Sequence, residues 1–386
     1  MSNKLPNQPL AGVRVVDFSR VLSGPYCTAL LADMGAEVIK IESPAGDDYR
    51  HVAPFKNGES ALFTQVNRGK KSVVVDLRTP QGQRAVRHLV ASADAVVENF
   101  RPGVAARLGV GWDELSALNP ALVFLSISGF GQTGPWANKA AYDVIIQGLC
   151  GLMSVTGQSD GPPTLVGEAV ADVVAGLFGA WALTTALFER ERKGGRNAPG
   201  RYIDLSMFDS MLSFMVTSTT SSLFTGETPV RVGNRHPSSA PFGCYAALDG
   251  YFSLAVLNNK LFAKLCTVIG AESLLEDERF VTDSSRNQHE SILRDHIEKW
   301  SRLRQVADIV SIFEAEGVPC GPLLDVVQAL SSEQAQSRNI LVPLEDHRLS
   351  PQCLVRQPAV FSGVLQERLK HAPKLGEHTS EYLSSL

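Results

Sequence analysis

VRVVDFSRVLSGPYCTALLADMGAEVIKIE, residues 13–42, contains two short apolar runs on either side of a helix-like segment. The first run, Val13–Asp17, ends at an acidic residue and predicts a buried strand. Residues 23–25 (SGP) break the pattern, Cys27–Met34 predicts a helix, and Val38–Ile41 predicts the next strand. Two parallel strands joined by one helix form the unit from which helix-covered parallel sheets are built.

The same alternation continues to about residue 130. Ser72–Asp76, Ala95–Glu98 and Leu122–Ile127 predict further strands, and residues 79–90 predict a helix. The pattern therefore predicts an open α/β sheet, whose ligands bind outside the carboxyl ends of the strands. Basic residues occur in or near the loops that follow the strands, and together they are candidates for phosphate binding: Lys70, Lys71, Arg78, Arg101, Arg107 and Lys139. For each residue alone, a solvated surface position is the favoured interpretation.

Residues 169–188, AVADVVAGLFGAWALTTALF, predict an apolar helix with a single charge, Asp172. A lone carboxylate among apolar residues must be paired, hydrogen-bonded or used in chemistry. Near the start of a helix it also lies in a favourable field. A buried cap, a structural ion pair and a functional acid all remain open at this point. The uncharged run from 173 to 188 is shorter than the ~20 residues of a membrane span, so we interpret it as a core helix.

Composition and motifs exclude several classes of function. Among 386 residues the formal net charge is -4, which disfavours a general nucleic-acid binder. The six cysteines are far apart and predict neither a metal site nor disulfides. The chain has no phosphate-loop, dinucleotide-binding, G-x-S-x-G or H-E-x-x-H motif. The N-terminal residues do not resemble a signal peptide, so we expect a cytoplasmic protein that does not associate with a membrane.

The remaining chain predicts three regions. A large domain at 1–225 includes a strand at Tyr202–Leu205 and a long helix at Phe208–Phe224. A small domain with linkers follows at 226–320 and contains a hairpin around Asp249-Gly250. The C-terminal segment, 321–386, has too few long periodic elements for a separate domain, and we expect it to return to the large domain.

Five segments give the sequence a clear resemblance to the family III CoA-transferases, the CaiB/BaiF family. The similarity covers nearly the whole chain, with the motifs in the family's order. The segments are LAGVRVVDFSRVLSGPYCTALLADMGAEVIKIESP, NRGKKSVVVDLRTPQG, VENFRPGVAARLGV, GFGQTGPWANKAAYDVIIQGLCGLMSVTG and GNRHPSSAPFGCY.

This resemblance implies a fold and a CoA site. Family members are interlocked homodimers with a large Rossmann-like domain, which binds CoA, and a smaller α+β domain. CoA and acyl-CoA are substrates, and no cofactor is permanently bound. Phe100 would pack on the adenine side, and Arg78, Arg107 and Lys139 would meet phosphates. The positions that match the family's CoA contacts are Val21, Ser23, Val75, Arg78, Asn99, Phe100, Arg107, Leu108 and Lys139.

The resemblance also implies that Asp172 is the nucleophile. Its carboxylate would attack the thioester of an acyl-CoA to give an acyl-aspartyl anhydride, and the CoA thiolate would return to give an aspartyl thioester. An acceptor acid would then take the CoA.

Departures from the family's patterns bear on the substrate. Tyr142 precedes Asp143 where the racemases of this family carry a histidine, which disfavours the alternative of an α-methylacyl-CoA racemase. Leu22 and the segment 257–259 differ from formyl-CoA transferase, which disfavours formate and oxalate. RVLSGP is more similar to members that use succinyl-CoA and small dicarboxylic acids. A non-catalytic CoA-binding protein is the third alternative. Candidate contacts to the acid substrate are Arg20, Tyr142, Arg235, His236 and Asn258.

Overall fold

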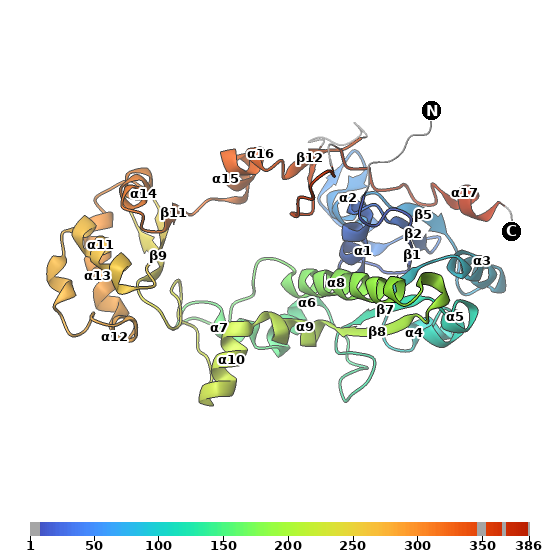
Figure 1. Ribbon diagram of the computed structural model, residues 1–386, viewed down its shortest axis with the longest axis horizontal. Coiled ribbons are helices and arrows are strands. Elements are labelled where there is room, and N and C mark those ends of the chain that lie inside the picture. The colour runs from blue at the N-terminus through green and yellow to red at the C-terminus, as the bar shows by residue number, and fades with distance from the viewer. Residues whose placement is uncertain (1–7, 346–352, 365–367, 385–386) are drawn as a thin grey trace. The chain divides into compact units, whose positions relative to one another are not determined.

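The computed structural model describes residues 8–345, 353–364 and 368–384, and Figure 1 shows the elements that they form. The chain divides into two compact units. The first comprises residues 1–152, 165–227 and 334–386, and the second comprises residues 153–164 and 228–333. The predicted mixed α/β fold is confirmed by the elements of the first unit.

A six-stranded parallel sheet forms the centre of the first unit, with strand order β5-β2-β1-β6-β7-β8. From β1 the chain proceeds outward to β2 and β5, and then returns to β6 on the other side of β1. The order in which strands are added therefore changes side between β1 and β6, and ligands of such sheets bind at this switch point. The strands are β1 (Arg14–Asp17), β2 (Glu37–Glu42), β5 (Lys71–Val74), β6 (Ala95–Glu98), β7 (Val123–Ser128) and β8 (Arg201–Ser206).

Successive residues of a strand point to opposite faces of the sheet, so the apolar strands place side chains on both faces. Helices cover each of the two faces. Phe124 packs in a core cluster with side chains of α3 (Pro80–Ala91) and α5 (Trp112–Leu118). Leu125 faces the opposite side, toward Gly179 of α8 (Val170–Arg192). Strands β1, β2, β6 and β7 are buried on both faces, as expected for a parallel sheet, whereas the edge strand β8 is partly exposed.

Helix α8 packs very closely against α1 (Ser23–Asp33). A Cβ atom at Gly176 would meet the Ser23 carbonyl oxygen at 2.8 Å, and one at Gly179 would meet Cys27 Sγ at 3.3 Å. By length and composition α8 would also pass as a membrane span. Core helices pass the same test, and Ala171, Ala175 and Leu183 of this helix are fully buried.

The second unit contains a three-stranded antiparallel sheet with order β11-β10-β9, packed against helices. The predicted hairpin is present, with β9 (Phe242–Ala246) paired to β10 (Tyr251–Ala255). Its other main elements are β11 (Cys320–Pro322), α11 (Asn259–Ile269), α13 (Glu290–Ser301) and α14 (Val306–Ala315).

The C-terminal segment runs beside the edge strand β5. His378 N donates to Ser72 O at 2.9 Å, and Val74 N donates to Thr379 Oγ1 at 3.0 Å. These contacts cover backbone groups of an edge strand that would otherwise be exposed. Residues 346–352, 365–367, 385 and 386 of the predicted C-terminal segment lie outside the described residues.

The other helices and strands of the described residues are short. They are α2 (Ala61–Asn67), α4 (Val104–Arg107), α6 (Asp143–Leu149), α7 (Leu152–Val155), α9 (Met207–Phe214), α10 (Val216–Thr225), α12 (Asp283–Gln288), α15 (Val326–Ser331), α16 (Glu333–Ser337), α17 (Thr379–Leu383), β3 (Phe55–Lys56), β4 (Glu59–Ser60), β12 (Leu341–Pro343), β13 (Cys353–Val355) and the 3-10 helices η1 (Asp48–His51), η2 (Gly195–Asn197) and η3 (Glu272–Leu275).

Two predicted helices were wrong in detail. Helix α1 begins at Ser23, four residues before the predicted start. Pro25 is tolerated there because N–H groups in the first turn of a helix have no partner within the helix. The single helix predicted at 208–224 is interrupted at Met215, whose ψ of 43° is not helical. The second half is rich in Thr and Ser, which are weak helix formers.

We predict that the two helical glycines of α8 differ in their tolerance of a methyl group. Gly176→Ala should lower the free energy of unfolding by about 1–3 kcal/mol, because the new Cβ meets backbone that must move. Gly179→Ala should change it by less than about 1 kcal/mol, because side chains of Leu125, Ile127 and Cys27 can adjust. Urea denaturation of both variants measures the difference. Equal losses would contradict the backbone contact between α1 and α8.

Candidate active site

The loops at the switch point enclose a hollow of about 320 Å³ with Asp172 in its lining. A second hollow of about 450 Å³ shares Arg20 and Phe100 with the first. Five predicted CoA contacts line the first hollow: Val21, Ser23, Asn99, Phe100 and Lys139. Val75, Arg78 and Leu108 line the second. Arg107 is exposed at the end of α4 and lines neither hollow. The structure thus brings together eight of these nine residues.

Asp172 is the third residue of α8 and is partly buried. Burial, and secondly the nearby charge of Asp143, raise the pKa of its carboxyl from 3.8 to about 6, although Ser23 acts in the opposite direction. The ionised carboxylate is therefore the major form of Asp172 at neutral pH, but it is less well stabilised than a carboxylate that is surrounded by water.

Asp143 and Gln147 fix the segment that leads into α8. Asp143 Oδ1 accepts from Ala171 N at 2.7 Å and so caps α8, whose own N-cap residue Ala169 has no side-chain acceptor. The buried Gln147 donates to Asp143 Oδ2 at 2.7 Å and accepts from Val166 N at 3.1 Å. Sequence reasoning missed this role of Asp143. The available signal was the i, i+4 spacing of Asp143 and Gln147 on α6.

Glu98 is a second buried acid beside the hollows. Its Oε2 accepts from Phe100 N at 2.7 Å, and Ser126 Oγ hydrogen-bonds its other oxygen. Burial raises the pKa of Glu98 to about 8. A neutral carboxyl at the end of β6 therefore holds the backbone of Phe100, which lines both hollows. The sequence indicated only that the strand ends here.

The cations at the mouth of the hollows already have neighbours. Arg20 Nη2 lies 2.7 Å from Asp48 Oδ1, and Arg78 Nε lies 2.8 Å from Asp76 Oδ1. Lys139 Nζ lies 4.1 Å from the centre of the Trp136 ring. These contacts are solvent-exposed and weak, so an anionic ligand can replace them at small cost.

Lys70 was wrongly grouped with the predicted phosphate-binding residues. It precedes β5, is 3% exposed, and lies 2.9 Å from Asp17 Oδ2. Burial lowers its pKa to about 8 despite the Asp17 charge. Lys70 is part of a buried ion pair that joins β1 to the start of β5.

The candidate contacts to the acid substrate lie in both compact units. Arg20 and Tyr142 line the Asp172 hollow, and Tyr142 is 69% exposed. The other three lie in the second unit. Arg235 donates to Asn287 Oδ1 at 2.9 Å, and His236 Nδ1 accepts from Ser238 N at 3.2 Å. Asn258 caps α11 by accepting from Leu261 N at 2.9 Å.

The described residues contain no group of three or more His, Cys, Asp or Glu placed to hold a metal ion. The first hollow brings together the Asp172 carboxylate, the cationic side chains of Arg20 and Lys139, and the start of helix α8.

We predict that Asp172→Asn stabilises the protein in a pH-dependent way. Because the folded state holds the Asp172 proton more tightly than the unfolded state, the carboxylate costs stability above pH 6. Asparagine should raise the free energy of unfolding by about 1–2 kcal/mol at pH 8, and the gain should fade as the pH drops from 6 toward 4. Urea denaturation at several pH values measures it. A gain that is equal at all pH values would contradict the raised pKa.

Comparisons with known proteins identify the family of this chain. The profile of CoA-transferase family III matches residues 10–379. The chain is similar to succinate–glutarate CoA-transferase of Agrobacterium fabrum, with 38% identity covering 100% of this chain and 97% of the relative. It is also similar to acetyl-CoA:oxalate CoA-transferase of Acetobacter aceti, with 43% identity covering 87% of this chain and 86% of the relative.

A solved structure extends the likeness to the fold. The crystal structure of a CaiB/BaiF family protein from Brucella suis superposes with a TM-score of 0.85 at 37% identity, covering 98% of this chain and 99% of that one. The profile, the relatives and the structure agree over nearly the entire chain. The chain belongs to CoA-transferase family III.

Proposed function

We propose that this CoA-transferase moves CoA from succinyl-CoA to a small dicarboxylic acid, with Asp172 as the nucleophile. The observation that carries the proposal is the position of Asp172. Its carboxylate is partly buried, has a raised pKa, and lies at the start of α8 in the hollow that the switch-point loops enclose.

The reaction begins when Asp172 attacks the thioester carbonyl. A carbon–oxygen bond forms, the carbon–sulfur bond breaks, and CoA leaves as a thiolate, which gives a succinyl-aspartyl anhydride. The thiolate then attacks the aspartyl carbonyl and releases succinate, which leaves an aspartyl thioester. The acceptor carboxylate then attacks the aspartyl thioester and displaces the CoA thiolate, which gives a second anhydride. The thiolate attacks the acceptor's carbonyl carbon in this anhydride. CoA is thereby attached to the new acid, and the Asp172 carboxylate is released.

The local structure supports these steps. The positive end of α8 stabilises negative charge that develops near residue 172. A partly buried carboxylate with a raised pKa is poorly solvated, and this raises its reactivity. The covered position of Asp172 also limits the access of water, which would hydrolyse the anhydride.

We place CoA across the two hollows. The shared residue Phe100 would pack against the adenine side, with its backbone held by Glu98. Arg78, Arg107 and Lys139 would meet the phosphates. Val21, Ser23, Val75, Asn99 and Leu108 would contact the rest of the molecule. CoA would bind as a substrate, and no resident cofactor is proposed.

The acid substrate is proposed from the relatives and from Arg20. The name of the Agrobacterium relative specifies the dicarboxylic acids succinate and glutarate, and these support the proposal. The name of the Acetobacter relative specifies acetyl-CoA and oxalate, and the departures at Leu22 and 257–259 disfavour oxalate for this chain. Arg20 lines both hollows and is 47% exposed, so its guanidinium is available to the distal carboxylate of such an acid. Tyr142 lines the same hollow as Asp172. Contacts from Arg235, His236 and Asn258 remain part of the proposal.

We further propose that the protein works as an interlocked homodimer in the cytoplasm. One side of α8 carries Leu177, Trp181 and Phe188, which are 47%, 65% and 64% exposed. On α10, Leu223 and Phe224 are 84% and 88% exposed. Apolar side chains gathered in this way are typical of surfaces that another chain covers. The six cysteines are free, in keeping with a reducing compartment.

A CoA-exchange assay tests the proposed reaction. Succinyl-CoA is mixed with mono- and dicarboxylic acids, including glutarate and oxalate, and mass spectrometry detects new thioesters. We expect new thioesters of dicarboxylic acids with the wild-type enzyme and at least a thousandfold less with Asp172→Asn, which preserves shape but not nucleophilicity.

The same assay includes arms for other reactions. CoA transfer from acetyl-CoA but not from succinyl-CoA would contradict the proposed donor, while the proposed type of reaction would stand. Loss of α-deuterium from a 2-methylacyl-CoA, with no exchange from any donor, would favour a racemase. CoA binding without either reaction would favour a non-catalytic protein. Exchange that persists in Asp172→Asn would contradict the assigned nucleophile.

We predict that Arg20→Ala separates dicarboxylic from monocarboxylic acceptors. The KM for the preferred dicarboxylic acid should rise about 10–100-fold, because a charge-assisted hydrogen bond of about 1.5–3 kcal/mol is lost. The KM for a monocarboxylic acid of similar length, wherever it is turned over, is the internal control. Equal changes for both acids would remove Arg20 from recognition of the distal carboxylate.

A further inference from the structure

Val21 has an unfavourable backbone conformation in the loop beside Asp172. Its φ is 69°, and the only other non-glycine residues with positive φ in the described chain are the asparagines Asn57 and Asn339. Asparagine tolerates this region, whereas for a β-branched residue it is a true outlier that costs about 1–3 kcal/mol. Such strain persists only where the surrounding structure fixes the backbone.

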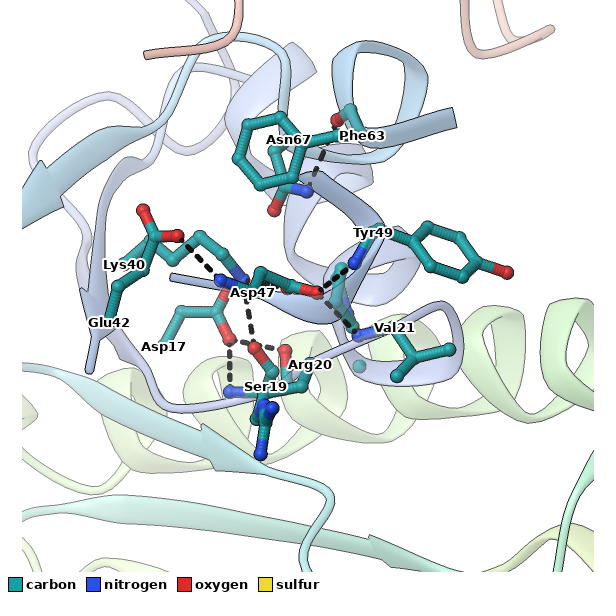
Figure 2. Close-up of polar contacts among 12 residues, drawn as sticks. Asp17, Ser19, Arg20, Val21, Lys40, Glu42, Asp47, Tyr49, Phe63 and Asn67 are labelled. Atoms are coloured by element: carbon teal, nitrogen blue, oxygen red, sulfur yellow. Dashed lines mark hydrogen bonds and ion pairs between the residues drawn. The ribbon is translucent and has the colours of Figure 1, made fainter. Parts of the chain in front are cut away.

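Asp47 fixes this backbone from one side. Its Oδ1 accepts from Val21 N at 3.1 Å and from Tyr49 N at 2.9 Å, as Figure 2 shows. Its Oδ2 lies 2.8 Å from Lys40 Nζ, and the two side chains are 0% and 1% exposed. Although burial alone would raise the pKa of Asp47, Lys40 and the two backbone N–H groups hold it below its usual value. Asp47 is therefore a buried carboxylate with a buried counter-charge.

Asn99 fixes the same loop from the other side. Its Oδ1 accepts from Arg20 N at 2.8 Å, and its Nδ2 donates to Arg20 O at 2.8 Å. The same Nδ2 donates to Ser23 Oγ at 3.3 Å. The strained turn is thus held by side chains from two other parts of the chain.

The turn at Val21 determines where Ser23 lies. Leu22 is the one residue between them, and α1 begins at Ser23. Ser23 and Asp172 line the same hollow, where the hydroxyl and N–H groups of Ser23 oppose the rise in the pKa of the Asp172 carboxyl. Relaxation of φ at Val21 would turn the following peptide groups and move these two donors away from the carboxylate.

We propose that Asp47 is a positioning residue for the transferase reaction: it holds Val21 in the left-handed conformation and so places the Ser23 donors against Asp172. Lys40 supplies the counter-charge that keeps Asp47 ionised in the core. The proposal rests on the proposed function because Asp172 must be the nucleophile.

The test compares Asp47→Asn with Asp33→Asn, each in the wild-type and in the Val21→Gly background. Asp33 is a matched control because it forms a buried 2.6 Å ion pair with Arg68 at the other end of α1. Asparagine at 47 keeps an acceptor but weakens the hold on Val21, and Lys40 retains its bond to Ser19 O. Glycine at position 21 adopts positive φ without strain.

We expect Asp47→Asn to lower kcat at least tenfold in the wild-type background and less than threefold in the Val21→Gly background. The melting temperature should fall to a similar extent in both backgrounds, because glycine does not restore the ion pair. Asp33→Asn should lower the melting temperature with little change in kcat. An equal loss of kcat in both backgrounds, or a loss of stability alone, would overturn the proposal.

A second variant and a second measurement complete the design. If Asp47→Asn does not fold, Asn99→Ser in the two backgrounds takes its place, with the same expected rescue by Val21→Gly. Amide hydrogen exchange of residues 19–26 is independent of activity and should be faster in the Asp47 or Asn99 variant than in Asp33→Asn. If the wild-type enzyme shows no CoA-transferase activity, the proposed function alone is contradicted. If the amide protection of residues 19–26 is unchanged in the Asp47 variant, the positioning role of Asp47 is contradicted.

Discussion

The close approach of α8 to the backbone of α1 is the constraint on which the site depends. Gly176 leaves no room between its Cα and the Ser23 carbonyl for a side chain. The start of α1 and the second turn of α8 are therefore held together at the switch point between β1 and β6. A larger residue would separate them and move Asp172 away from the loop that surrounds it. The same contact that builds the core thus positions Asp172, the proposed nucleophile.

Around this contact, acids with different environments perform different tasks. Asp47 has a buried cation and remains ionised, so it serves as a fixed acceptor for backbone N–H groups. Glu98 has only neutral neighbours in hydrogen-bond contact, and burial favours its protonated form. Asp172 lies between these extremes, with a pKa of about 6. A carboxylate that is charged yet poorly stabilised is suited to a nucleophile that must also act as a leaving group.

The sequence was sufficient to predict the strands and the loops that carry the site. Apolar runs of four to six residues and the breaks that follow them mark β1, β2, β6 and β7, and the order of such units implies a parallel sheet. It was not sufficient to predict Asp47, Asp143 or Glu98, because their roles depend on which backbone N–H each meets in space. Lys70 was misplaced for the same reason, since its buried partner Asp17 is distant in sequence. The function came from resemblance to a family, because periodicity alone left Asp172 open to structural interpretations.

The most direct test of Asp172 as nucleophile is chemical trapping of its thioester. The enzyme is incubated with succinyl-CoA without an acceptor acid, reduced with borohydride, digested and mapped by mass spectrometry. Reduction of an aspartyl thioester converts the residue to homoserine. The account predicts homoserine at position 172, dependent on succinyl-CoA and absent from Asp172→Asn. An unmodified Asp172 in an enzyme that exchanges CoA, or homoserine at another acidic position, would contradict it.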